Sequence, residues 1–414
     1  MSTLRSLTCA LIALLVLAAS ASASANTPTS ISASEGHTCA SMLDGSVDCF
    51  GNFYPQALKT QWPTPIPGIS RAVSVSSGVR YNCALLAGGT VDCWGDDGFG
   101  QLGNGANTDT AVPVHVLGIA NAVAISTGGF HACALLSGGQ VKCWGHNLEG
   151  ALGDGSGNDS SVPVLVRGIT SAVSISAGYD EDETCAVLAG GTVDCWGSGE
   201  YGQLGNGVAG DSATPVPVKG ITNAVAVAAG GLHSCAVLAS GAVECWGQNE
   251  LGELGNGSRR DSAVPVPVRG LPGPATAVAV AARAYSCALL AAGTVYCWGG
   301  NPRNQLGNNH LSFASAVPVK VAGVTGALSI STGTVHACAL LTGGVADCWG
   351  SDDYGQLGNG PRLGGILGAG PVIFPSTPTP TPTPTLSVAS ATAVDSPRPL
   401  LRRSHVRLQR QENR

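Results

Sequence analysis

Seven pairs of cysteines recur along this chain, and nine residues separate the two cysteines of every pair. The first cysteines of successive pairs are 44 to 52 residues apart. A repeat period near fifty residues is typical of propellers, solenoids and arrays, so it constrains the fold before any single residue is considered. The pairs are Cys39 and Cys49, Cys83 and Cys93, Cys133 and Cys143, Cys185 and Cys195, Cys235 and Cys245, Cys287 and Cys297, and Cys338 and Cys348.

The N-terminal segment, residues 1–25, has the pattern of a secretory signal peptide. It combines Arg5, an apolar run too short to span a bilayer, and an A-x-A site ending at Ala25. Cys9 lies in this segment, so fourteen of the fifteen cysteines remain in the mature chain. An even number of cysteines in an exported protein predicts disulfides. We therefore expect a secreted or extracytoplasmic protein, with the cell surface included and no membrane span.

The C-terminal part predicts a linker and a tail. Residues 375–386 alternate Thr and Pro, which favours a stiff extended spacer. Residues 387–414 carry six arginines against Asp395 and Glu412. A disordered end is the simpler interpretation of this basic tail, and binding to an anionic surface is the alternative.

Each repeat is predicted to hold four short strands. In the copy around Cys133, the segments 112–116, 122–126, 132–136 and 141–144 are separated by Gly, Asn and Asp. Four strands per fifty residues correspond to one propeller blade, so residues 26–374 predict an all-β, seven-bladed β-propeller of four-stranded antiparallel blades. The first repeat lacks a preceding P-V-x-V segment, and residues 370–374 offer a matching one. We expect this C-terminal strand to complete the first blade and close the ring.

The hairpin between paired cysteines can be predicted closely. Glycine stands six residues after the first cysteine in every copy, as Gly139 does after Cys133. A three-residue hairpin loop of this kind places Cys133 opposite Cys143 at a non-hydrogen-bonded pair, where Cα atoms are ~4.5–5.5 Å apart. That separation suits a disulfide, and we predict seven of them. Structural zinc is the rival interpretation, but its ligand pairs are usually two to four residues apart; no metal or other cofactor is expected.

A large aromatic residue and then glycine follow the second cysteine of every pair. Packing between neighbouring blades is the favoured interpretation, and a platform for a ligand is the alternative. The residues are Phe50, Trp94, Trp144, Trp196, Trp246, Trp298 and Trp349.

Three strings carry a family resemblance: I-S-T-G-G-F-H-A-C-A-L-L at 125–136, V-K-C-W-G at 141–145 and G-Q-L-G-N-G at 100–105. Over roughly residues 31–360 the chain resembles the regulator of chromosome condensation repeat, and the C-A-L and C-W-G copies resemble its exported bacterial, alpha-tubulin-suppressor-like branch. The resemblance implies a seven-bladed propeller. The export signal and the paired cysteines depart from the eukaryotic nuclear members. They argue against guanine-nucleotide exchange, because the GTPase partner would lie in another compartment.

Two repeat positions carry side chains that could do chemistry. The position two residues before the first cysteine holds four histidines, for which a structural hydrogen bond between copies is favoured over metal or acid–base work. The position before the second cysteine holds five acids, which form either a negative ring that attracts a basic partner or a solvated blade position that blocks edge pairing. The position two residues before the first cysteine holds His37, Tyr81, His131, Glu183, His233, Tyr285 and His336. The position before the second cysteine holds Asp48, Asp92, Lys142, Asp194, Glu244, Tyr296 and Asp347.

The fourth repeat contains the clearest irregularity. Two extra residues lie between Gly178 and Cys185, and the tract reads Tyr-Asp-Glu-Asp-Glu at 179–183. Insertions in repeat proteins map to loops and often to binding faces. Asp180, Glu181 and Asp182 are therefore candidate binding residues; calcium and an inert loop are the alternatives, and the tract lacks EF-hand spacing.

The functional expectation is a binding scaffold without catalysis. The net charge is −6 for the whole chain, +4 for the tail and +1 for the signal segment, which leaves −11 for residues 26–386 and disfavours nucleic acid. We expect a monomer that binds a protein partner or a surface ligand. A passive cell-surface component is one alternative, and an enzyme acting on polysaccharide is another, although the sequence shows no catalytic constellation.

Overall fold

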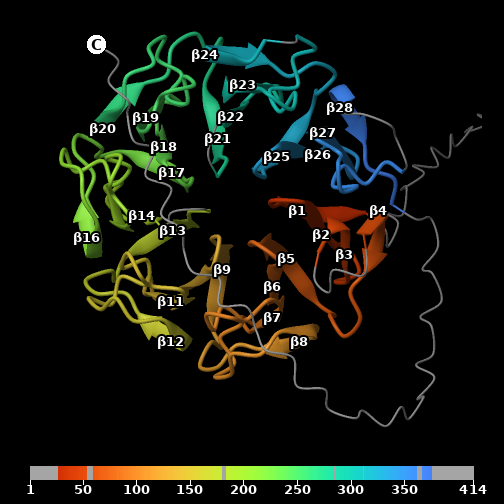
Figure 1. The fold of residues 1–414 in the computed structure, drawn as a ribbon, viewed down its shortest axis with the longest axis vertical. Helices are drawn as coiled ribbons and strands as arrows, with labels where there is room; N and C mark the ends of the chain where they lie inside the picture. The colour runs from red at the N-terminus through yellow and green to blue at the C-terminus, as the bar shows by residue number, and fades with distance from the viewer. Residues whose placement is uncertain are drawn as a thin grey trace, which may run out of the picture. The chain divides into compact units, whose positions relative to one another are not determined.

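The computed structural model describes residues 27–53, 59–179, 183–282, 285–310, 312–360 and 366–374. These residues form seven four-stranded antiparallel sheets arranged as blades around a central channel (Figure 1). The fold class predicted from the repeat is confirmed. None of the described residues forms a helix long and apolar enough to cross a membrane. The predicted signal peptide, Thr-Pro linker and basic tail lie outside the described residues.

The innermost strand of each blade lines the channel, and the second strand lies directly outside it (Figure 1). The innermost strands are β1 (Pro28–Ala33), β5 (Ala72–Ser77), β9 (Ala122–Thr127), β13 (Ala172–Ala177), β17 (Ala224–Ala229), β21 (Ala275–Val280) and β25 (Ala327–Thr332). The second strands are β2 (His37–Met42), β6 (Tyr81–Leu86), β10 (His131–Leu136), β14 (Glu183–Leu188), β18 (His233–Leu238), β22 (Tyr285–Leu290) and β26 (His336–Leu341).

The third strand forms a hairpin with the second, and the fourth strand lies at the perimeter. The third strands are β3 (Val47–Asn52), β7 (Val91–Gly95), β11 (Val141–Gly145), β15 (Val193–Gly197), β19 (Val243–Gly247), β23 (Val295–Gly300) and β27 (Val345–Gly350). The perimeter strands are β4 (Lys59–Pro65), β8 (Thr110–His115), β12 (Ser160–Leu165), β16 (Ser212–Pro217), β20 (Ser262–Pro267), β24 (Ala314–Lys320) and β28 (Ile366–Pro371).

A disulfide joins the second and third strands of every blade. Cys133 lies opposite Cys143 in the ladder, as the hairpin argument requires. The chain turns at Gly139, which has φ of 79°, a conformation that glycine adopts without strain. Cα atoms of the bonded cysteines are 4.0–4.1 Å apart, slightly closer than expected, and all fourteen cysteines are fully buried.

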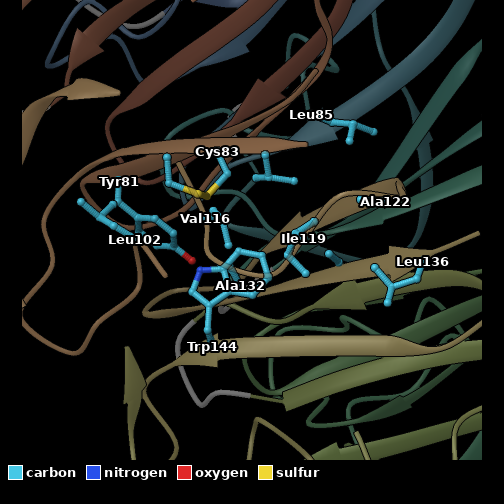
Figure 2. Packing of buried hydrophobic residues seen from close by; sticks show 13 residues of the cluster. Tyr81, Cys83, Leu85, Leu102, Val116, Ile119, Ala122, Ala132, Leu136 and Trp144 are labelled. Atoms are coloured by element: carbon cyan, nitrogen blue, oxygen red, sulfur yellow. A yellow bond between two sulfur atoms is a disulfide. The ribbon is translucent and has the colours of Figure 1, made fainter. Parts of the chain in front are cut away.

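The aromatic after the second cysteine fills the space between two blades. Trp144 of the third blade is fully buried against Leu102, Val116 and Ile119, and Figure 2 shows its indole beside them. Its Nε1 donates to the Gln101 carbonyl at 2.9 Å. The favoured interpretation of packing is thus confirmed, and it explains why glycine stands at Gly103, since a side chain there would strike the indole.

The prediction that residues 370–374 complete the first blade is wrong. The strand β28 pairs with β27 of the last blade, and the first blade has its own perimeter strand, β4. The segment 112–116, predicted to open the third blade, belongs to β8, which ends the second. The physical reason is that the long loop after each third strand carries the chain to the perimeter of the same blade, and only then does the chain enter the next blade.

The ring closes by side-to-side packing of the first and last blades, which Figure 1 shows in red and blue. The Thr334 N–H donates to the Ser34 carbonyl at 3.2 Å. The Ala33 N–H donates to Ser331 Oγ at 2.9 Å, and the same bond joins four other pairs of successive blades. Phe50 and Val372 add an apolar contact across this junction. The closing interface therefore repeats the contacts found elsewhere in the ring.

Candidate functional site

The buried polar residues at the starts of the second strands link each blade to the next. His37 Nε2 lies 2.8 Å from Asn82 Oδ1, and His131 Nε2 lies 2.8 Å from Thr184 Oγ1. Equivalent bonds join His233 to Ser286, His336 to Thr38, and Glu183 to Ser234. These side chains are essentially inaccessible to solvent. The interpretation of this position as a structural hydrogen bond between copies is confirmed.

The two tyrosines at this position use a different partner. Tyr81 reaches the backbone of the next blade, where its hydroxyl donates to the carbonyls of His131 and, at 3.3 Å, Gly128. Tyr285 donates to the His336 carbonyl at 2.5 Å and the Gly333 carbonyl at 3.1 Å. The residue facing each tyrosine from the next blade is alanine (Ala132 or Ala337), where the other blades carry Asn, Thr or Ser. Alanine leaves room for the longer side chain, so the two positions vary together.

Burial controls the ionisation of these polar side chains at the starts of the second strands. It lowers the pKa of His233 and of His336 to about 3, and that of His37 to about 4 despite the bond to Asn82. These imidazoles are therefore neutral at physiological pH. Burial also raises the pKa of Glu183 well above its ordinary value, which the bond from Ser234 at 2.6 Å only partly offsets. These side chains hydrogen-bond neighbouring blades to one another and are buried from solvent.

The acids before the second cysteine lie within the third strands, where each pairs with the last residue of its perimeter strand. Asp48 is buried, and burial, helped by the nearby Asp44, raises its pKa to about 6. Burial likewise raises the pKa of Asp194, Glu244 and Asp347. These four carboxylates are therefore partly desolvated, and their role as a negative ring that attracts a basic partner stays a prediction.

One end of the ring, which we call the inner-turn face, holds the turns between the first and second strands. Tyr179, which follows β13, extends across the channel from the fourth blade to the first. Its hydroxyl bonds to Ser34 Oγ and accepts the Glu35 N–H at 2.8 Å. The channel below contains a cavity of about 210 Å³ lined largely by serine, threonine and alanine side chains. Tyr179 thus spans the channel mouth on this face and contributes to the lining of the cavity.

The candidate binding residues Asp180, Glu181 and Asp182 lie outside the described residues. The residues on either side are described. Tyr179 is anchored at the channel mouth, and its N–H also donates to the Gly230 carbonyl of the next blade at 3.1 Å. Glu183 is buried at the start of β14. Both flanks of the insertion are therefore fixed at the inner-turn face.

Aromatic side chains gather on the same face, over the second and third blades. The rings of Phe99 and Phe130 are 5.5 Å apart and meet edge to face, and Phe99 lies 4.6 Å from the His146 ring. Phe99 and Phe130 remain partly exposed. Exposed aromatic side chains beside charged groups are typical of protein-binding surfaces.

A second candidate site, which the sequence argument missed, lies at the perimeter where the first and last blades meet. Trp62 on β4 and Tyr354 in the loop after β27 border a pocket of about 400 Å³. The sequence contained one indication of this site: six of the seven tryptophans occupy the repeat position after a cysteine, and Trp62 does not. Among the described residues, no cluster of three or more His, Cys, Asp or Glu side chains could hold a metal ion.

Comparison with family models identifies the repeat. The model described as "Regulator of chromosome condensation (RCC1) repeat" matches residues 89–135, 138–180, 191–237, 240–290 and 292–340, which together exceed half of the chain. The chain belongs to the RCC1 repeat family. A second RCC1 model matches five stretches between residues 72 and 356. The exported bacterial branch of this family remains a proposal.

Solved structures of RCC1-like proteins share the fold. Prp20p from Saccharomyces cerevisiae superimposes with a TM-score of 0.70 at 21% identity, over 85% of this chain and 89% of that one. Human WBSCR16 gives a TM-score of 0.68 at 22% identity, over 76% of this chain and 85% of that one. Among curated proteins, the human E3 ubiquitin-protein ligase HERC2 is 27% identical over 183 residues, which are 43% of this chain but only 4% of the ligase. The two solved structures share the fold of this chain, and the matched segment is a small part of the ligase.

Proposed function

We propose that this RCC1-repeat protein is an exported, non-catalytic binding scaffold whose partner is a protein that docks on the inner-turn face. The observation that carries the proposal is Tyr179. It departs from the repeat, crosses the channel mouth and bonds to Ser34 and Glu35 of the opposite blade. Tyr179 spans the channel mouth and is anchored directly before the acidic insertion. We therefore infer that this end of the ring serves as a binding surface and that the channel does not serve as a passage.

The chemistry of this face suits a protein partner with basic side chains. The sequence has three acids at 180–182, directly after Tyr179, and the exposed Glu35 lies beside the Tyr179 hydroxyl. Phe99 and Phe130 supply apolar contact area that a partner could cover. Opposite charge around an aromatic centre gives specificity and speeds association. Yeast Prp20 has been solved bound to Kap60 and is described as binding Gsp1p and histones; for this chain we also propose a protein partner, although a different one.

Export is supported by the sulfur chemistry. Seven disulfides, each within its own blade, form and persist in oxidising compartments. The segment at 1–25 has the composition of a signal peptide. The same compartment argues against guanine-nucleotide exchange as the role of this chain, because intracellular GTPases are absent from it.

The test is capture of partners from the culture medium and cell envelope of the source organism. The bait is the mature protein, and its matched variant carries Asp180→Asn, Glu181→Gln and Asp182→Asn. The control variant neutralises three acids within the third strands: Asp92, Asp194 and Asp347, each changed to Asn.

We expect one protein to bind in stoichiometric amount, to dissociate as salt increases, and to be lost with the variant at 180–182 but not with the control. If no protein is enriched over the control resin, the protein is a passive surface component. Equal binding by both variants would place the partner elsewhere on the ring.

A further inference from the structure

The perimeter pocket between the first and last blades is built differently from the equivalent place on the other blades. It is lined by Thr60, Gln61, Trp62 and Thr64 of β4 and by Asp353 and Tyr354 of the loop after β27. Strand register aligns Trp62 with Val112, Val162, Val264 and Val317, because Thr60 pairs with Gly51 as Thr110 pairs with Gly95. Four of the other six blades carry valine at this position, the fourth and seventh blades carry Thr214 and Gly368, and blade one carries the aromatic Trp62.

Trp62 differs from the other tryptophans in exposure. Its side chain is 46% exposed, whereas the six tryptophans of the repeat are 0% exposed. Tyr354, across the pocket, is 42% exposed. Single exposed apolar side chains are ordinary on protein surfaces. Two large rings that face the same pocket from different blades provide a flat apolar lining with polar edges.

Both rings are held in place by glycines. The Trp62 indole rests on Gly360, where any side chain would strike it, and the Gly360 N–H donates to the Gln61 carbonyl at 3.2 Å. A Cβ added at Gly36 would lie 3.1 Å from Tyr354 Cδ2. Each ring therefore packs closely on backbone that carries no side chain, which limits the space available to the ring on that side.

The hydrogen bonds within β4 also differ from those within the other perimeter strands. In five other perimeter strands the first Ser or Thr hydroxyl donates to the carbonyl two residues ahead, as Thr110 does to Val112 at 3.0 Å. In β4 the Trp62 carbonyl accepts from Thr64 Oγ1 instead, at 3.1 Å. Thr60 Oγ1 is then buried with no hydrogen-bond partner among the described residues. The pocket wall thus contains an unused hydroxyl next to the amide of Gln61.

The charge in the pocket is balanced. Asp353 Oδ2 lies 3.3 Å from Arg303 Nη1 and accepts a hydrogen bond from Ser351 Oγ at 2.9 Å. A cationic ligand would have to compete with Arg303 for this carboxylate. A neutral ligand with hydroxyl groups could bond to the other oxygen of Asp353, to Gln61 and to Thr64 without displacing an existing partner.

We propose that this pocket binds a pyranose unit of a neutral polysaccharide. A pyranose has a flat C–H face that can stack on Trp62 or Tyr354 and a rim of hydroxyls that can bond to Gln61, Thr64 and Asp353. The site lies at the perimeter, where a long glycan chain has access from outside the ring. This inference rests on the proposed function in one respect only, since it assumes binding without catalysis; the protein partner at the inner-turn face is independent of it.

The experiment measures quenching of tryptophan fluorescence by iodide in the mature protein. Iodide reaches Trp62 alone, because the other six tryptophans are fully buried. The probes are cellohexaose, maltohexaose, laminarihexaose and chitohexaose. Choline and a nine-residue polyproline peptide serve as competing ligand classes for an aromatic pocket.

We expect at least one hexasaccharide to protect Trp62 from iodide and to bind with a measurable Kd by calorimetry. Tyr354→Leu, which installs the residue found at the equivalent Leu251, should weaken binding by about tenfold, and Trp62→Val should weaken it at least as much. The control Val112→Trp places an exposed tryptophan on β8 without the pocket, and it should leave the affinity unchanged.

Three results would overturn the proposal. Trp62 could be protected from iodide only by choline or by the peptide, none of the four hexasaccharides could bind, or Trp62→Val could bind a hexasaccharide with unchanged affinity. Protein capture by the same preparation separates the two ideas. If a protein partner binds while no hexasaccharide does, this inference fails and the proposed function stands. If a hexasaccharide binds while no protein partner does, the glycan pocket is supported and the proposed protein-binding function fails.

Discussion

The indole between blades offers a quantitative test of how the ring is stabilised. Trp144 is fully buried and makes one hydrogen bond, to the Gln101 carbonyl. Burying about 200 Å² of aromatic surface at about 25 cal/mol/Å² contributes about 5 kcal/mol, an upper value because unfolded chains already bury some surface. Trp→Ala substitutions in cores typically cost about 3–5 kcal/mol. We therefore expect Trp144→Ala to lower the free energy of unfolding by about 4 kcal/mol.

This loss can be converted to a melting temperature. About 330 described residues at about 2.1 cal/mol/K each give an unfolding entropy near 0.7 kcal/mol/K, so about 4 kcal/mol lowers Tm by about 6 °C. Trp144→Phe installs the residue that blade one carries as Phe50 and keeps most of the apolar contact. It should cost about 1–2 kcal/mol, which lowers Tm by about 1–3 °C, because the Gln101 carbonyl loses its donor.

Differential scanning calorimetry of the oxidised protein measures these shifts, with circular dichroism as a check that each variant is folded. The control is Trp62→Val, which changes an exposed tryptophan to the residue of the other blades and should move Tm by less than about 1 °C. If Trp144→Ala melts within about 1 °C of Trp62→Val, the indoles do not hold the blades together and the packing argument is refuted.

Two further predictions concern the buried polar side chains at the starts of the second strands. Burial raises the pKa of Glu183 above its value in the unfolded chain, so the folded state binds the proton more tightly, and stability is highest below the unfolded pKa and falls as pH rises above it. Glu183→Gln should therefore raise Tm relative to the wild type at pH 7–8 and leave it nearly unchanged near pH 4, so that the difference in Tm between the two proteins grows as pH rises; a difference that does not change with pH would contradict the assigned burial. His233→Tyr and Ser286→Ala should each destabilise the protein, whereas the double variant recreates the combination of Tyr81 with alanine and should recover most of the loss in Tm; additive losses would show that the two positions are independent.

The hairpin was predictable because its geometry is local. Nine intervening residues with glycine at Gly139 allow one symmetric register, and that register places Cys133 against Cys143. The aromatic at Trp144 was also predictable, because a blade must bury both faces on its neighbours. The blade boundary was not predictable in this way. The segment at 112–116 follows one hairpin and precedes the next, and sequence spacing alone does not decide which sheet it joins.

The sites depend on contacts between distant parts of the chain, and these were beyond the sequence argument. Tyr179 and Ser34 are 145 residues apart, and only the closed ring brings them together across the channel. Trp62 and Tyr354 come from opposite ends of the repeat array and meet only because the first and last blades pack side by side. The sequence did mark both places as irregular, through an insertion and through a tryptophan outside the repeat.

The central claim is a ring of seven blades, each closed by its own disulfide. Peptide mapping of the mature protein under non-reducing conditions, with free thiols alkylated first, tests it most directly. The account predicts seven linked pairs, each joining cysteines ten positions apart, such as Cys133 with Cys143, and no alkylated cysteine. Disulfides between different blades, or a substantial yield of alkylated thiols, would contradict it.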